Sequence, residues 1–473
     1  MDSERSTLPG RDLHLVLDPR AGRRSSLEEA LRQAIRDGRL QADGRLPSTR
    51  ALAADLGVSR GTVTDAFDQL VAEGWLVARQ GSGTRVAAAP RPGVAVGGRP
   101  VSPAAPAPGH DFRPGHGDLS LFPRRAWLAA SRRAVREVTE AELDYGDARG
   151  LPALRGVLAD YLGRARGLPV DPERLVVSRG FVHGFSLLAE ALRDGGVTTV
   201  AVEDPSMARN PATLRRLGLG VATVGVDDGG ADPAALESAG SVGAVVLTPA
   251  HQYPTGVTLS AERRAAWIDW ARAHDGVIVE DDYDGEFRYD RQPVGALAAL
   301  DPARVVYAGT TSKTLAPGLR LGWMVVPEPW VEAIVDLRGV VDRQSGALEQ
   351  LTLAEMIGSG AFDRHVRHCR LRYRRRRDLL LAQLADRVPA VTVHGIAAGL
   401  HVVIDLPRGG PSEEEAVAHL AGAGVAVHPL AAYRHERDGS APPALVVGFA
   451  SPPEHAFAVG VRALTGALGA LYA

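Results

Sequence analysis

Lysine and cysteine are almost absent from the sequence. Lys313 is the one lysine among 54 Lys and Arg residues, and Cys369 is the one cysteine. A single cysteine excludes an intramolecular disulfide and is typical of a reducing cytosol. Arginine cannot replace lysine in Schiff-base chemistry, which needs a deprotonatable primary amine. Lys313 is therefore either a leftover surface charge or a reactive amine. The residues around it in the sequence distinguish the two possibilities.

The sequence also lacks a strong net charge, a secretory signal and a long apolar run. Its formal net charge is −2, so any nucleic-acid binding must come from a local patch. No apolar run follows the charged residues 1–6, which excludes a secretory signal. Residues 456–473 are apolar but contain Arg462, which predicts a closing amphipathic helix rather than a membrane span. We expect a cytoplasmic protein with no membrane partner.

The length of 473 residues is too great for one ordinary core and predicts two or three domains. Residues 87–110 consist almost wholly of Ala, Pro, Gly and Val, a composition typical of an extended linker. We therefore expect a small domain over 1–86 and a large domain over 111–473, with a smaller C-terminal subdomain from about residue 330.

The first 86 residues show short helical periods followed by a hairpin pattern. Ser48 is the predicted N-cap of a helix over 49–56, and Ser59 the N-cap of a second helix three residues later. Residues 75–79 and 84–86, separated by a Gly-rich turn, predict two strands. This order is that of a winged helix-turn-helix.

The run LPSTRALAADLGVSRGTVTDAF from Leu46, followed by LVAEGW and GSGT, resembles the winged helix of GntR-type regulators. The recognition helix of such a domain presents its first turn to the major groove, where arginines and hydroxyls meet phosphates and base edges. The alternative is a packing module that does not bind DNA, because this segment holds 13 Arg against 12 Asp and Glu. The resemblance implies that operator DNA is contacted by Arg50, Ser59, Arg60, Thr62 and Thr84.

Beyond residue 110, β-rich apolar runs alternate with helical periods. This alternation predicts an α/β fold with a mainly parallel sheet, whose ligands bind at the carboxyl ends of the strands. The predicted strands are 174–177, 199–203, 244–247, 276–280, 305–308 and 322–326, and the helical periods are 185–191, 211–217 and 263–273.

Two motifs follow predicted strands of this sheet. In TTSKTLAPGLRLGW, from Thr310, a buried Lys313 amine can form an aldimine with an aldehyde, while Thr310, Ser312 and Arg320 suit a phosphate. In VIVEDDYD, from Val277, a carboxylate can keep a pyridine nitrogen protonated, and Tyr283 can hydrogen-bond a ring phenolate. The same acidic run could instead hold Mg²⁺, although no GxxxxGK phosphate loop lies nearby.

These motifs, with YGDARGLPALR from Tyr145 and TPAHQYPTG from Thr248, resemble fold-type I aminotransferases. The two domains together resemble MocR-type regulators within the GntR superfamily. The resemblance implies pyridoxal 5'-phosphate (PLP) on Lys313, with Asp281 at the pyridine nitrogen and Tyr283 at the phenolate. It also implies a phosphate held by Thr310, Arg320 and the backbone of Gly180 and Phe181. Tyr145 would reach the phosphate of the partner subunit in a head-to-tail homodimer.

The sequence departs from the aminotransferase pattern at two positions. Met207 stands where an aromatic ring usually stacks on the cofactor, and Val446 stands about where an arginine grips the substrate carboxylate. Arg209 could compensate by binding an effector carboxylate. The departures favour a transcription regulator that senses PLP, an amine or an amino acid through Lys313. The alternatives are an aminotransferase with an accessory DNA-binding domain and a PLP lyase or decarboxylase.

An arginine-rich run over 364–378 has two interpretations. It could be a second DNA-binding patch, or a solvated helix face between the two subdomains, which we favour. The 14 histidines show no metal-ligand spacing, so no metal is expected. Cys369 is predicted to be a packed side chain.

Overall fold

The computed structural model describes residues 13, 15, 17–18, 22–79, 83–87, 108–237, 240–289, 294–435 and 442–472. The chain divides into two compact units, Met1–Pro106 and Ala107–Ala473. The predicted turn at 80–82 and most of the predicted linker lie outside the described residues. None of the described helices is long and apolar enough to cross a membrane.

The first unit is the predicted winged helix-turn-helix. Ser48 Oγ accepts a hydrogen bond from the N–H of Ala51 at 3.2 Å, and Ser59 Oγ accepts one from Thr62 at 3.1 Å. These caps start both helices as the sequence predicts. The elements are α1 (Arg23–Arg36), α2 (Thr49–Leu56), α3 (Arg60–Ala72) and the antiparallel pair β1 (Leu76–Arg79) and β2 (Gly83–Val86).

The second unit is built on an eight-stranded, mostly parallel sheet of strand order β4-β11-β10-β9-β8-β5-β6-β7. Five neighbouring strands run parallel, so their carboxyl ends meet at one edge. The strands are β4 (Leu175–Ser178), β5 (Thr199–Asp204), β6 (Gly220–Asp227), β7 (Gly230–Ala231), β8 (Ala244–Leu247), β9 (Val277–Asp282), β10 (Val305–Thr310) and β11 (Gly322–Val325).

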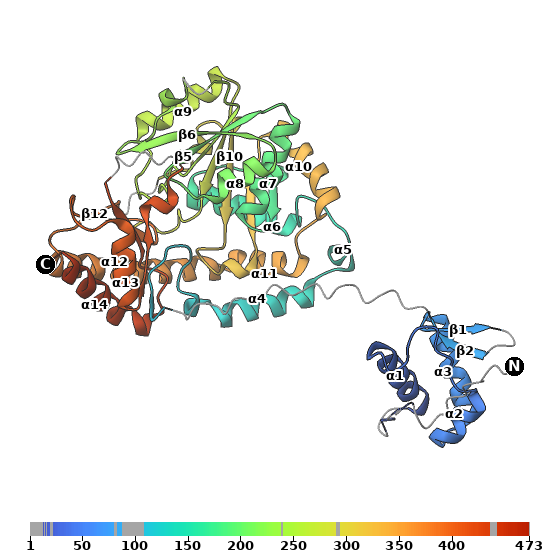
Figure 1. Ribbon diagram of the computed structural model, residues 1–473. Helices are drawn as coiled ribbons and strands as arrows, with labels where there is room; N and C mark the ends of the chain where they lie inside the picture. Colours follow the sequence, from blue (N-terminus) through green and yellow to red (C-terminus); the bar gives the residue numbers. More distant parts are fainter. Residues whose placement is uncertain are drawn as a thin grey trace. The chain divides into compact units, whose positions relative to one another are not determined.

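Helices cover both faces of this sheet, which confirms the predicted α/β fold (Figure 1). Alternate residues of each strand face opposite cores, since successive side chains in a strand point to opposite sides. One core includes α7 (Phe181–Asp194), α8 (Arg209–Arg216) and α10 (Glu328–Val341). The other includes α6 (Pro152–Arg166), α9 (Ala261–Ala273), α11 (Ala347–Gly358) and, at its margin, α4 (Arg124–Glu137).

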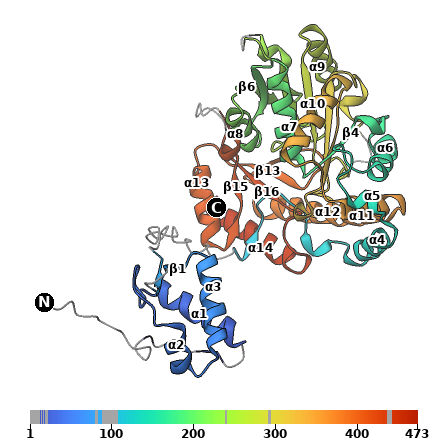
Figure 2. The same cartoon turned by 90° about the vertical axis from the view of Figure 1, so that its right-hand side faces the viewer.

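A smaller α+β subdomain closes the chain (Figure 2). Its core also includes Phe112, because β3 (His110–Asp111) pairs with β14 (Val425–Ala426). The sequence predicts that this subdomain begins near residue 330. That position lies on α10, which packs against the large sheet. The subdomain holds the sheet β12 (Thr392–His394), β13 (His401–Asp405), β16 (Ala444–Gly448) and β15 (His428–Pro429), with α13 (Glu413–Gly422) and α14 (Glu454–Leu471).

The arginine-rich run lies on α12 (Ala361–Arg387), which contributes to the core of the large sheet at one end and to the core of the smaller subdomain at the other. Arg364 and Arg374 are exposed, as expected for a solvated face. Arg376, in contrast, is 3% exposed and donates to Asp118 Oδ2 at 2.7 Å and to the carbonyl of Pro452 at 2.8 Å. The run therefore includes one buried arginine, whose hydrogen bonds connect the start of the large unit to its C-terminal segment.

Candidate functional site

A cavity of about 300 Å³ lies at the carboxyl edge of the large sheet. The strands β5, β8, β9 and β10 deliver side chains to it, as expected for ligand sites of open α/β sheets. The sequence-predicted residues that line this cavity are Phe181, Met207, Arg209, Asp281, Tyr283, Thr310, Ser312, Lys313 and Arg320.

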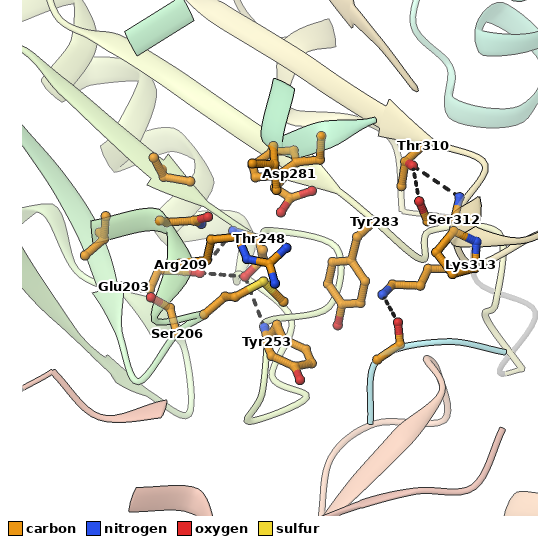
Figure 3. Close-up of a pocket in the computed structure, with 18 of the residues that line it drawn as sticks. Glu203, Ser206, Arg209, Thr248, Tyr253, Asp281, Tyr283, Thr310, Ser312 and Lys313 are labelled. Atoms are coloured by element: carbon orange, nitrogen blue, oxygen red, sulfur yellow. Dashed lines mark hydrogen bonds between the residues drawn. The ribbon is translucent and has the colours of Figure 1, made fainter. Parts of the chain in front are cut away.

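Lys313 enters the cavity from the segment that follows β10 (Figure 3). Its Nζ donates to the carbonyl of Gly115 and lies 5.9 Å from the centre of the Tyr283 ring. Burial lowers the pKa of the Lys313 amine, and the carboxylates of Asp284 and Asp281 oppose this shift. A lowered amine pKa makes lysine a better nucleophile near neutral pH.

Asp281, on β9, presents a carboxylate to the same cavity. Its Oδ1 is buried and has no hydrogen-bond partner among the described residues. Burial raises the pKa of Asp281 well above its ordinary value, although the Lys313 amine acts in the opposite direction. A ligand that brings an N–H donor or a positive charge to Oδ1 would relieve this cost.

The adjacent carboxylates do not join Asp281 around a common centre. Glu280 accepts hydrogen bonds from the backbone N–H groups of Leu297 and Ala298 at 2.8 and 2.9 Å. Asp282 lies 2.6 Å from the Nε of Arg166. The described residues contain no cluster of three His, Cys, Asp or Glu side chains that could hold a metal. This arrangement argues against the Mg²⁺ alternative.

Groups suited to an anion lie at another side of the cavity. Gly180, at φ 81°, is the N-cap of α7, whose first N–H groups have no acceptor within the helix. A side chain on Gly180 would lie 3.3 Å from Nη1 of Arg320, so the backbone and the guanidinium approach closely. Thr310 Oγ1 and Ser312 Oγ are 2.9 Å apart. These groups form a cradle of donors that fits a phosphate.

A primary amine, an unpartnered acid and an anion cradle therefore share one cavity. The pyridine nitrogen, aldehyde and phosphate of PLP require these three groups. The described residues fit this cofactor.

The sequence reasoning missed several residues of the cavity wall. Glu203 Oε2 accepts hydrogen bonds from the hydroxyl and the N–H of Thr248 at 2.5 and 3.1 Å. Tyr253 donates to the hydroxyl of Tyr433 at 3.1 Å. The motif from Thr248 to Gly256 could have indicated Thr248 and Tyr253. No sequence motif indicates that Gly115 lines the cavity. The missed lining residues include Gly115, Val202, Glu203, Ser206, Asn210, Val246, Thr248, Tyr253 and Pro317.

The two departures from the aminotransferase pattern lie beside each other. Val446, on β16, is fully buried in an apolar cluster with Tyr253 and Tyr433, and Met207 packs against this cluster. Of the described residues that line the cavity, two are arginines, Arg320 and Arg209, the first residue of α8.

Tyr145 lies outside the cavity of its own chain. Its side chain is 75% exposed, and the guanidinium of Arg343 lies 4.7 Å from the centre of its ring. Its role in a partner subunit stays a prediction.

The residues predicted to contact DNA lie on the first turns of α2 and α3 and on β2. Arg50 and Arg60 are exposed. The hydroxyls of Ser59 and Thr62 are 2.8 Å apart, so both take part in the cap of α3. Thr84 lies on β2, paired with Ala78.

Two family models match the chain. Residues 23–86 match the bacterial regulatory proteins of the gntR family, and residues 115–444 match aminotransferase class I and II. An archaeal alanine:glyoxylate aminotransferase has a similar structure, with a TM-score of 0.69 and 27% identity, over 76% of this chain and 90% of that one.

Relatives resemble the chain over both units. The HTH-type pyridoxine biosynthesis transcriptional regulator PdxR of Corynebacterium glutamicum is 35% identical, over 83% of this chain and 86% of its own. The probable rhizopine catabolism regulatory protein MocR of Rhizobium meliloti is 34% identical, over 85% of each chain.

The fold is thus that of the PLP-dependent aminotransferases, joined to a winged helix of the gntR type. The chain belongs to the MocR-type regulators of the GntR superfamily, transcription regulators with an aminotransferase-like domain.

The wall residue Glu203 gives the unliganded cavity a pH dependence. Burial raises the pKa of Glu203 from 4.5 to about 7, despite the hydrogen bonds from Thr248 and Gln252. A carboxyl group with a raised folded-state pKa stabilises the fold below its unfolded-state pKa. That contribution is lost as the pH rises through the folded-state value.

We therefore expect Glu203→Gln to gain stability over the wild type between pH 5 and pH 8, by on the order of 2 kcal/mol. The three hydrogen bonds end on Oε2, so an amide oxygen can accept them. Urea unfolding of the ligand-free protein at both pH values measures this gain. The exposed control Glu262→Gln should change stability by less than about 0.5 kcal/mol at either pH. Equal pH dependence in wild type and Glu203→Gln would contradict the assignment.

Proposed function

We propose that the chain is a cytosolic, PLP-responsive regulator that binds operator DNA through the first turns of α2 and α3 and through β2. Its aminotransferase-like unit senses PLP itself, or an amine or amino acid that reacts with PLP. The unpartnered Oδ1 of Asp281, in the same cavity as the Lys313 amine, carries this proposal.

PLP would supply an aldehyde for covalent attachment to an amine and a pyridine ring that withdraws electrons. Lys313 Nζ would be the attachment point, and the Asp281 carboxylate would accept a hydrogen bond from the protonated ring nitrogen. The Tyr283 hydroxyl would donate a hydrogen bond to the ring oxygen. Thr310, Ser312, Arg320 and the N–H groups at Gly180 and Phe181 would bind the phosphate, and Met207 would pack on the ring.

The effector is held more weakly than an aminotransferase substrate. A carboxylate in this cavity can pair with Arg209, but the buried Val446 offers it no second guanidinium. In a head-to-tail homodimer, Tyr145 would contact the phosphate in the partner's cavity. Two subunits would then be needed for a complete site.

The first prediction concerns the attachment point. The purified protein should show the visible absorption band of pyridoxal bound to an amine, because Lys313 carries the sole side-chain primary amine of the sequence. Borohydride reduction and peptide mass spectrometry should locate the cofactor on Lys313. A label on the N-terminal amine, or an unchanged band in Lys313→Arg, would contradict this.

The second prediction concerns the DNA contact. Arg60→Ala should weaken operator binding roughly 5- to 150-fold, equivalent to about 1–3 kcal/mol for a lost contact. Its cofactor spectrum should not change, because Arg60 and Lys313 lie in separate units. Fluorescence anisotropy with labelled operator measures the affinity. Arg36→Ala, on α1, is the matched control and should bind as the wild type does. Unchanged affinity in the double variant Arg50→Ala/Arg60→Ala would contradict operator recognition by α2 and α3.

The third prediction separates a sensor from an aminotransferase. Without a guanidinium at Val446, an amino acid is poorly oriented on the cofactor, and misorientation can cost on the order of 10²-fold in rate. We expect kcat below ~1 s⁻¹ with a panel of amino donors and keto acids. Multiple turnovers above that rate would identify the protein as an enzyme with an accessory DNA-binding domain.

A further inference from the structure

A second cavity, of about 430 Å³, lies between α6, α12 and the segment that follows β9. It shares no lining residue with the first cavity. Its charged lining consists of four arginines and two acids: Arg166, Arg288, Arg367, Arg370, Glu286 and Asp363.

Arg166 gives this cavity a buried cationic group. The residue is 4% exposed, and its Nη2 is buried with no hydrogen-bond partner among the described residues. Its Nε lies 2.6 Å from Oδ2 of Asp282, so the ion pair leaves Nη2 available. A buried unpartnered N–H group costs free energy until an acceptor reaches it.

Two arginines of α12 add positive charge. Arg370 Nε donates to the carbonyl of Glu286 at 2.7 Å, which leaves its terminal nitrogens for another acceptor. Arg367 is exposed and has no ion-pair partner among the described residues. The hydroxyl of Tyr161 already donates to Glu286 at 3.1 Å, so this acid is partly satisfied without the arginines.

We propose that this cavity is a second ligand site that binds the phosphate group of a small organic phosphate. A phosphate dianion has three terminal oxygens and can accept from several guanidinium groups at once, with charge-assisted bonds. A cavity of this volume also has room for the organic part of such a ligand. The site is built from residues that take no part in the proposed PLP site.

The phosphate could also belong to the DNA backbone, because α12 carries further arginines. The burial of Arg166 favours a small molecule, since a duplex cannot bring its backbone to a group that is 4% exposed. Arg367 and Arg370 alone could meet DNA, so the experiment must separate these sources.

The second cavity has two physical connections to the first. Arg166 pairs with Asp282, whose neighbour on β9 is Asp281 of the first cavity. Arg288 Nη1 donates to the carbonyl of Ala250 at 3.2 Å, and the adjacent His251 lies within 2.9 Å of the Tyr283 hydroxyl. A ligand on Arg166 and Arg288 would therefore change the contacts that position Asp281 and Tyr283. Such a change shifts the affinity of the first cavity for its own ligand.

Equilibrium dialysis of the full-length protein with radiolabelled inorganic phosphate tests the proposal. The probe can also enter the first cavity, so Arg320→Gln is used to remove the guanidinium there. We expect phosphate binding to survive in Arg320→Gln. Adding Arg367→Ala should lower the affinity of the remaining site at least tenfold, and adding the exposed control Arg374→Ala should not. Circular dichroism checks that Arg367→Ala, an exposed change, leaves the fold intact.

Loss of all phosphate binding in Arg320→Gln, or equal affinity after Arg367→Ala, would overturn the second site. A duplex DNA that displaces the phosphate from Arg320→Gln would assign these arginines to the DNA backbone and would also overturn it. The absorption spectrum of bound PLP tests the first cavity independently, so failure of one site is distinguishable from failure of the other.

Discussion

Near the end of the parallel strand β9, Asp281 has a buried Oδ1 with no hydrogen-bond partner among the described residues, and the rest of the site is arranged around it. Strand alternation turns Glu280 and Asp282 away, to backbone N–H groups and to Arg166, so of these three neighbouring acids only Asp281 faces the cavity. The same sheet edge brings Lys313 from the segment that follows the next strand, β10. A ligand with a cationic ring nitrogen satisfies the acid, and an aldehyde on that ring meets the amine. The energetic cost of an unpaired acid in the free protein becomes binding energy for one kind of cofactor.

In the proposed function, the surroundings of Asp281 and Lys313 favour binding over turnover. A fast aminotransferase holds the substrate carboxylate firmly, because orientation at the reacting carbon contributes to the rate. Here the corresponding wall is the apolar cluster of Val446, Tyr253 and Tyr433. In the proposed function, Arg209 binds the carboxylate of an amino acid that reacts with PLP, and a regulator needs only unequal binding in two states of the protein. The DNA affinity of the winged helix, which lies in a separate unit, can then differ between the two states.

Much of this organisation could be predicted from the sequence, because it depends on local patterns. The caps at Ser48 and Ser59, the strand β8 and the motif around Lys313 are encoded in short runs. Contacts between distant residues could not be predicted. Gly115 accepts a hydrogen bond from Lys313, almost 200 positions away, and Arg376 pairs with Asp118 although Arg374 and Arg375 are exposed. The strand β6 was also not predicted; two of its eight residues are glycines, and only one of the eight is buried.

The central claim is that occupancy of the Lys313 site changes operator binding. Its most direct test is the dissociation constant for the DNA upstream of the protein's own gene, measured with and without PLP, in wild type and in Lys313→Arg. Coupling between two sites is typically about 1–3 kcal/mol, so PLP should change the wild-type constant roughly 5- to 150-fold. The constant of Lys313→Arg should not respond. Identical operator affinity of the wild type with and without PLP would contradict the account.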